Sequence, residues 1–206
     1  KHLYQVAMGK EPADIVIKNG QIVNVFTGEI YPGGVAVAGD KIAAVGDVEY
    51  TIGDKTTIID AEGKYITPGF IDGHIHPESA NLSMPRFAEI VLCHGTTSIF
   101  TDLHEIGVVG GMDAMTASLD EGKQTPLKFY WVIPSHIPFS PMLETSGGTI
   151  NAEIIEKALS REDAVGLSEA VSFYVAFEHP DLMQSMEATQ KARKVICGHG
   201  PDTVGP

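Results

Sequence analysis

The chain has 206 residues, of which 43% are hydrophobic, so it is long enough to bury a sizeable core in one or two domains. Its formal charge is −13 and it has no run of Lys and Arg, which argues against nucleic acid or an anionic membrane surface as a partner. The two cysteines, Cys93 and Cys197, lie far apart in the sequence, as expected of a cytoplasmic protein without a disulfide framework. We also expect neither a membrane span nor a signal peptide, because no long apolar run and no charged-then-apolar leader is present.

Residues 1–67 have the pattern of a small β module. Short alternating or β-branched runs are separated by turn signals such as Asn19-Gly20, Gly39-Asp40 and Glu62-Gly63. This pattern predicts an antiparallel arrangement with strands at residues 15–18, 21–26, 35–38, 41–45 and 57–59.

Residues 68–206 have a different pattern, in which apolar strands alternate with helical segments. The predicted strands are residues 69–74, 96–102, 127–133, 164–167 and 195–197, and the predicted helices are 85–93, 108–121, 152–159 and 181–192. Such alternation predicts an α/β fold with a parallel sheet and right-handed crossovers. An eight-stranded barrel needs about 250 residues, so this segment suits only the first five strands of one. A flavodoxin-like domain also has five parallel strands, and the count alone leaves both folds open.

Polar or titratable side chains follow each of the five predicted strands. In chain order they are His74, His76 and Glu78; Asp102, His104 and Glu105; Ser135 and His136; Ser168 and Glu169; and His199. The carboxyl ends of parallel strands are where barrels and open α/β sheets build their active sites. Because residues two apart on a strand point to the same side, His74 and His76 would face one spot, as two metal ligands do.

The residues at these strand ends carry a family resemblance. The stretch PGFIDGHIHPES resembles the first-strand motif of the amidohydrolase superfamily. The stretches HGTTSIFTDLHEIGVVGG, ETSGG, VGLSEAVSF and GHGPDTVG are similar in order and character to the N-terminal portion of the adenine deaminase family. The resemblance implies the first five strands of a TIM-type (β/α)8 amidohydrolase barrel in residues 68–206, truncated after the fifth strand. Residues 1–67 would be the N-terminal part of a small β-sandwich domain.

The resemblance also implies a metal centre with two divalent ions. His74 and His76 would hold one ion and His199 the other, and Glu169 would bridge them, with Glu169 and His199 as catalytic residues. Many superfamily members bridge with a carboxylated lysine, but GLSEAV contains no lysine. Imidazole and carboxylate ligands suit manganese, iron or zinc. The family favours manganese or iron, and zinc also fits.

The implied reaction is hydrolytic deamination of a purine base, adenine to hypoxanthine and ammonia, with Glu78, Asp102, His104 and Glu105 binding the substrate. The family's later histidine and aspartate ligands have no counterpart in the chain. We therefore expect it to be inactive alone and to form a homo-oligomer or associate with a C-terminal segment. His136 and Cys197 stand where the family usually has cysteine and aspartate. Cyclic amide hydrolysis and a non-catalytic metal-binding role therefore remain alternatives.

Overall fold

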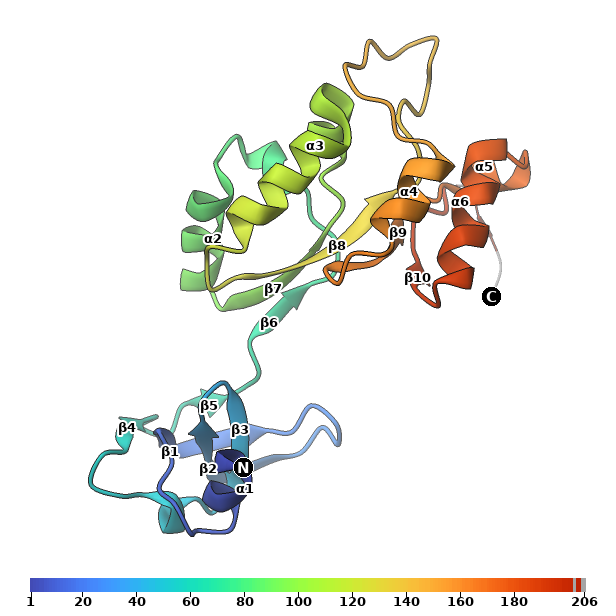
Figure 1. Ribbon diagram of the computed structural model, residues 1–206. Helices are drawn as coiled ribbons and strands as arrows, with labels where there is room; N and C mark the ends of the chain where they lie inside the picture. The colour runs from blue at the N-terminus through green and yellow to red at the C-terminus, as the bar shows by residue number, and fades with distance from the viewer. Residues whose placement is uncertain (202, 205–206) are drawn as a thin grey trace. The chain divides into compact units, whose positions relative to one another are not determined.

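The computed structural model describes residues 1–201 and 203–204. The chain divides into two compact units, Lys1–Pro68 and Gly69–Pro206, which are described separately (Figure 1). Within the described residues, no helix is long and apolar enough to cross a membrane.

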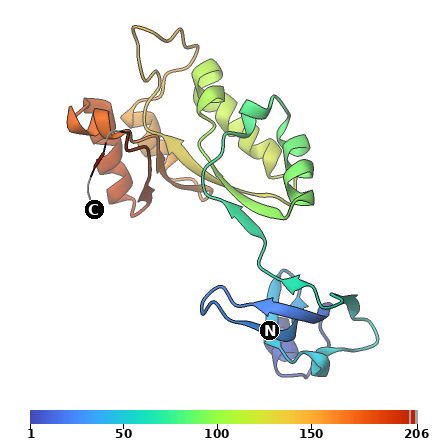
Figure 2. The same cartoon turned by 180° about the vertical axis from the view of Figure 1, so that it is seen from behind.

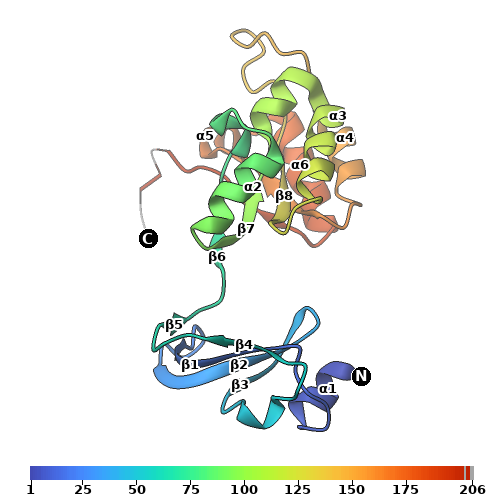
Figure 3. The ribbon, with the colours of Figure 1, turned by 90° about the vertical axis from the view of Figure 1, so that its left-hand side faces the viewer.

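The first unit is one mixed β-sheet with a short helix. Its elements are α1 (His2–Ala7), β1 (Ile15–Val23), β2 (Ile30–Ala38), β3 (Lys41–Gly46), a 3-10 turn (Glu49–Thr51), β4 (Thr57–Asp60) and β5 (Tyr65–Ile66). The strand order is β3-β2-β1-β4, and β5 also pairs with β1 (Figure 3). The prediction of an antiparallel module is right for β1, β2 and β3 but wrong for β4, which runs parallel to β1. The sequence analysis did not predict β5, which is also parallel to β1. A small core holds α1 and the sheet together, made of Val6, Ala13, Val16, Ala36, Ala38 and Val48.

The predicted turn at Asn19-Gly20 is instead an irregularity inside β1. The register of β1 against β2 shifts between Ile17 and Gly20, and Asn19 has a φ of 58°. The Asn19 carbonyl accepts a hydrogen bond from the Gly63 backbone N–H at 2.7 Å, which ties the strand to the turn before β5. A left-handed residue serves a β-bulge as well as a hairpin turn, so the dipeptide signal alone could not separate the two.

The second unit is a five-stranded parallel sheet with helices between its strands. Its elements are β6 (Phe70–Asp72), a 3-10 turn (Pro77–Ala80), α2 (Met84–Cys93), β7 (Thr96–Thr101), α3 (His104–Gly122), β8 (Lys128–Pro134), α4 (Ala152–Ala158), β9 (Ala164–Ser168), α5 (Ser172–Ala176), α6 (Pro180–Lys191) and β10 (Val195–Ile196). The spatial order β6-β7-β8-β9-β10 equals the chain order, and all pairs are parallel (Figure 2). A flavodoxin-like sheet has its first two strands exchanged, so the order is that of a barrel and not of a doubly wound sheet. The predicted half-barrel is confirmed.

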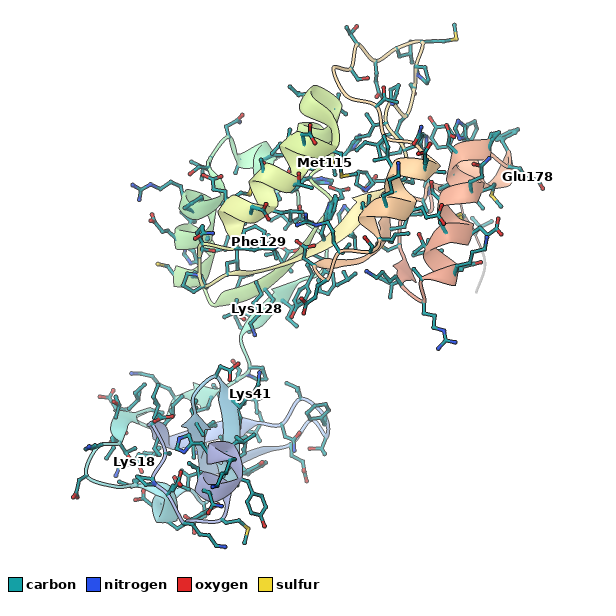
Figure 4. The ribbon with its side chains drawn as sticks, viewed as in Figure 1. Lys18, Lys41, Met115, Lys128, Phe129 and Glu178 are labelled. Carbon is teal, nitrogen blue, oxygen red and sulfur yellow. The ribbon has the colours of Figure 1, made fainter. Side chains whose placement is uncertain are left out.

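The core of this unit lies between the strands and the helices. It is built from aliphatic and aromatic side chains of β7, β8, β9, α3, α4 and α6, among them Ile99, Trp131, Leu167, Leu119, Ile155 and Leu182. Figure 4 labels two further members, Met115 on α3 and Phe129 on β8. The buried residues of α3 recur every three or four positions, as one face of a helix requires. α3 begins at His104, four residues before the predicted start, and is kinked at Gly111, where φ is 65°.

Candidate metal centre

Three strand ends of the second unit bring imidazoles and one carboxylate together. His74 and His76 follow β6, Glu169 follows β9 and His199 follows β10. The Nε2 atoms of His74 and His76 are 3.2 Å apart. Glu169 Oε1 lies 3.4 Å from His74 Nε2 and 3.1 Å from His199 Nε2. The carboxylate therefore stands between the histidine pair of β6 and the histidine after β10.

Hydrogen bonds fix the backbone that presents Glu169. Its side chain is 90% buried, and its φ of 56° turns the chain sharply at the end of β9. The Ser135 hydroxyl, from the end of β8, donates to the Glu169 carbonyl oxygen at 2.9 Å. The Ser172 backbone N–H donates to the His199 carbonyl oxygen at 2.9 Å, which couples the chain after β10 to α5. Neighbouring strand ends therefore position one another's side chains.

The donor set fits a divalent ion. Two nitrogens bound at 2.0–2.1 Å to a tetrahedral ion would be about 3.3 Å apart, close to the separation of the two Nε2 atoms. Burial lowers the pKa of His74, the nearby His76 lowers it further, and Glu169 opposes the shift. A lowered pKa keeps the imidazole in the neutral form that binds metals. Ligand atoms of His74, His76, Asp102 and Glu169 lie within 4.8 Å of one another.

Asp102 belongs to this centre by geometry, although its position in the sequence associated it with substrate binding. It follows β7, is fully buried, and its Oδ1 lies 2.9 Å from His76 Nδ1. Burial raises the pKa of Asp102 to about 7, His76 lowers it, and Glu169 raises it. The contact with His76 joins residues 26 positions apart in the chain, so no local pattern could have indicated it.

Glu78 and Glu105 form a second pair beside the centre. The Glu105 backbone N–H donates to Glu78 Oε1 at 3.2 Å, and the Ser79 hydroxyl donates to Glu105 Oε1 at 2.9 Å. Burial and the neighbouring Glu105 raise the pKa of Glu78 to about 8. Both glutamates border a surface hollow of about 420 Å³, together with Asn81, Ile106, Val109, Gly110 and Ala114. Glu105 Oε2 is also 3.3 Å from His76 Nδ1, so the hollow adjoins the candidate metal centre.

Buried His136 and half-buried His104 and His179 pack together with Phe139. The His136 ring stacks on His179 with centroids 4.7 Å apart, and the rings of His104 and His136 each meet Phe139 edge-on at 4.5 and 4.6 Å. Burial lowers the pKa of His136 to about 4, with a further contribution from His179. Of the residues expected to bind substrate, His104 is thus the one packed into this aromatic group.

Solved structures with the same fold include an adenine deaminase and a hydantoinase. A crystal structure of an adenine deaminase matches with a TM-score of 0.63 at 21% identity, over 93% of this chain and 51% of that one. The L-hydantoinase (dihydropyrimidinase) of Arthrobacter aurescens matches with a TM-score of 0.62 at 20% identity, over 91% of this chain and 40% of that one. The fold is therefore that of the amidohydrolases. No protein-family model matches the chain.

The more similar curated relatives are adenine deaminases. The adenine deaminase of Moorella thermoacetica is 44% identical over 200 residues, which cover 97% of this chain and 34% of that protein. Adenine deaminase 3 of Rhizobium meliloti is 40% identical over 200 residues, which cover 96% of this chain and 34% of that protein. The adenine deaminase of Ruegeria sp. is 42% identical over 209 residues, which cover 99% of this chain and 35% of that protein. The chain is a homologue of the N-terminal portion of the adenine deaminases, as its motifs predicted, and spans about a third of the length of these relatives.

Proposed function

We propose that the chain is the N-terminal part of a metal-dependent hydrolytic deaminase that converts a purine base, most simply adenine, to hypoxanthine and ammonia. The observation that carries the proposal is the approach of His74, His76 and His199 to Glu169 at the carboxyl ends of the strands. Similarity to adenine deaminases over nearly the whole chain supports the choice of substrate. In this proposal residues 1–67 begin a β-sandwich domain and residues 68–206 are the first half of a barrel.

Each side chain of the centre has a distinct task. His74 and His76 would hold one divalent ion through Nε2, and His199 would hold the second. Glu169 would lie between the ions, where its negative charge offsets their mutual repulsion. Bound ions would lower the pKa of water and so supply a nucleophile at neutral pH. Imidazole and carboxylate donors suit manganese or iron, and also zinc.

Glu78 and Glu105 retain the proposed role in substrate binding because they border the hollow beside the centre. With a pKa of about 8, Glu78 would be largely protonated at neutral pH. A protonated carboxyl donates a hydrogen bond to an unprotonated ring nitrogen, whereas the carboxylate of Glu105 accepts one from an exocyclic amino group. A purine base offers both partners. His104 would contribute from the first turn of α3, whereas the full burial of Asp102 suits a different task.

Full activity would require more protein than this chain. Among the described strands, β6 and β10 each have one unpaired edge, and Phe70, Ile71 and Val195 on these strands are exposed. Unpaired edges and exposed apolar side chains favour association. We propose that a C-terminal segment, or a second copy of the chain, completes the barrel and supplies the missing acid–base group. Such groups typically contribute about 100- to 10,000-fold to the rate, so the chain alone would be nearly inactive.

Elemental analysis of the purified protein tests the metal centre. The double substitution His74→Ala/His76→Ala should sharply reduce bound manganese, iron or zinc. His94→Ala is the matched control, because His94 is exposed at the end of α2 and away from the strand ends. Undiminished metal in the double variant would refute the assignment. Ammonia release from adenine, other aminopurines and hydantoins would separate deamination from cyclic amide hydrolysis.

A further inference from the structure

We propose that Asp102 is a positioning residue that holds Nδ1 of His76 and thereby directs Nε2 of that ring at the metal. This inference rests on the proposed metal centre and assigns Asp102 neither to the substrate nor to the ion. It departs from the sequence-based expectation that Asp102 binds the substrate.

The two nitrogens of the His76 ring have different neighbours. Nε2 lies 3.2 Å from His74 Nε2, whereas Nδ1 lies 2.9 Å from Asp102 Oδ1. The two ring nitrogens point away from each other, so a carboxylate beside Nδ1 is on the far side of the ring from an ion bound at Nε2. Metal-bound histidines commonly donate their other N–H to such a carboxylate, which fixes the tautomer and raises the basicity of the ligand nitrogen.

Asp102 is held rigidly enough for this task. It is fully buried, and the His104 backbone N–H donates to Oδ1 at 3.1 Å. The Trp131 indole N–H, from the core of the second unit, donates to the Asp102 carbonyl oxygen at 3.2 Å. Contacts to both the side chain and the backbone therefore fix the carboxylate at the end of β7.

Glu105 also contacts His76 Nδ1 but is the weaker candidate for positioning the ring. Its Oε2 lies 3.3 Å from His76 Nδ1, and half of its side chain is exposed. A buried carboxylate interacts more strongly than a solvated one because water screens it less. Neither contact of Nδ1 is aligned as a hydrogen bond, so the proposal requires the His76 ring to rotate until its Nδ1–H points at Asp102.

The test is a metal titration of the full-length protein carrying Asp102→Asn, with Glu105→Gln as the matched control. We expect Asp102→Asn to bind as many ions at saturation as the wild type, with the affinity for one ion lowered about 10- to 100-fold. The KM for adenine should be unchanged, and Glu105→Gln should have a smaller effect on affinity. Loss of one ion at saturation would instead make Asp102 a ligand. A raised KM with unchanged metal affinity would make it a substrate-binding residue, and either result overturns the proposal.

Two further measurements separate this inference from the metal centre itself. If His76→Ala leaves metal binding unchanged, the proposed centre is wrong. If His76→Ala loses metal while Asp102→Asn binds it like the wild type, only the role of Asp102 is refuted. Should Asp102→Asn fail to fold, ¹⁵N NMR of the His76 ring in the wild-type protein tests the same point. A proton on Nδ1 supports the proposal, and a proton on Nε2 overturns it.

Discussion

Lys194 connects the stability of the second unit to the position of a candidate metal ligand. Its ammonium group donates to the carbonyl oxygens of Leu159 at 2.6 Å and Arg161 at 3.0 Å, and it also contacts that of Ala164. These carbonyls belong to the end of α4, the following loop and the start of β9. Lys194 directly precedes β10, which leads to His199, so the three contacts fix β10 against its neighbours.

Replacing Lys194 by Met keeps most of the apolar stem and removes all three contacts. A hydrogen bond to a charged group contributes about 1.5–3 kcal/mol, but three bonds to one partly exposed ammonium do not add fully. We therefore expect Lys194→Met to lower the free energy of unfolding by about 3 kcal/mol. For a unit of this size that corresponds to a fall in Tm of roughly 10 °C.

Thermal and urea unfolding monitored by circular dichroism would measure the loss. Lys191→Met is the control, because Lys191 pairs with Glu187 at 2.8 Å on the exposed surface of α6. Exposed pairs of this kind contribute about 0.5 kcal/mol or less. If Lys194→Met destabilises the protein no more than Lys191→Met does, the carbonyl contacts do not hold β10 in place and the reasoning fails.

Three other predictions concern charge and packing. A hydrogen bond from Arg161 lowers the pKa of Asp163 to about 2. Because this pKa is depressed in the folded state, the contribution of Asp163 to the free energy of unfolding is complete above about pH 4 and is lost as the pH falls toward 2. Asp163→Asn should therefore cost about 2 kcal/mol at pH 7 and little at pH 2, and equal losses at both pH values in urea unfolding would contradict this. Gly148→Ala should lower the free energy of unfolding by at least about 2 kcal/mol, because its Cβ would overlap the backbone of α3. Gly73→Ala, whose Cβ meets nothing within 4 Å, should be nearly neutral. Similar melting temperatures of the two variants would refute the packing argument. Glu169→Gln should lower the metal content measured by elemental analysis, because the amide cannot offset two positive charges, and unchanged content would mean that Glu169 does not bridge.

Much of the second unit could be predicted from sequence because its signals are local. The runs before His74 and before Asp102 are apolar and bounded by turn residues, and the helical segments between them carry a regular apolar face. The rule that parallel strands end at one edge then brings His74, Glu169 and His199 together without further information. The strand order, which the sequence left open, needed the structure.

The features of the fold and of the candidate site that could not be predicted depend on contacts between residues distant in the sequence. The parallel pairing of β4 and β5 with β1 is decided by tertiary packing, whereas neighbouring turn signals favoured antiparallel hairpins. Helices α1 and α5 have six and five residues, too short for a periodic pattern to be read. The approach of Asp102 to His76 likewise follows from the pairing of β6 with β7, and not from either motif.

The central claim is that the strand-end histidines and Glu169 bind divalent metal that purine deamination requires. The most direct measurement is ammonia release from adenine by the full-length protein before chelation, after removal of metal, and after manganese, iron or zinc is returned. We predict that release is lost with the metal and restored by at least one of the three ions, and that His74→Ala/His76→Ala is not restored by any of them. Adenine deamination that continues unchanged in metal-depleted protein would contradict the account.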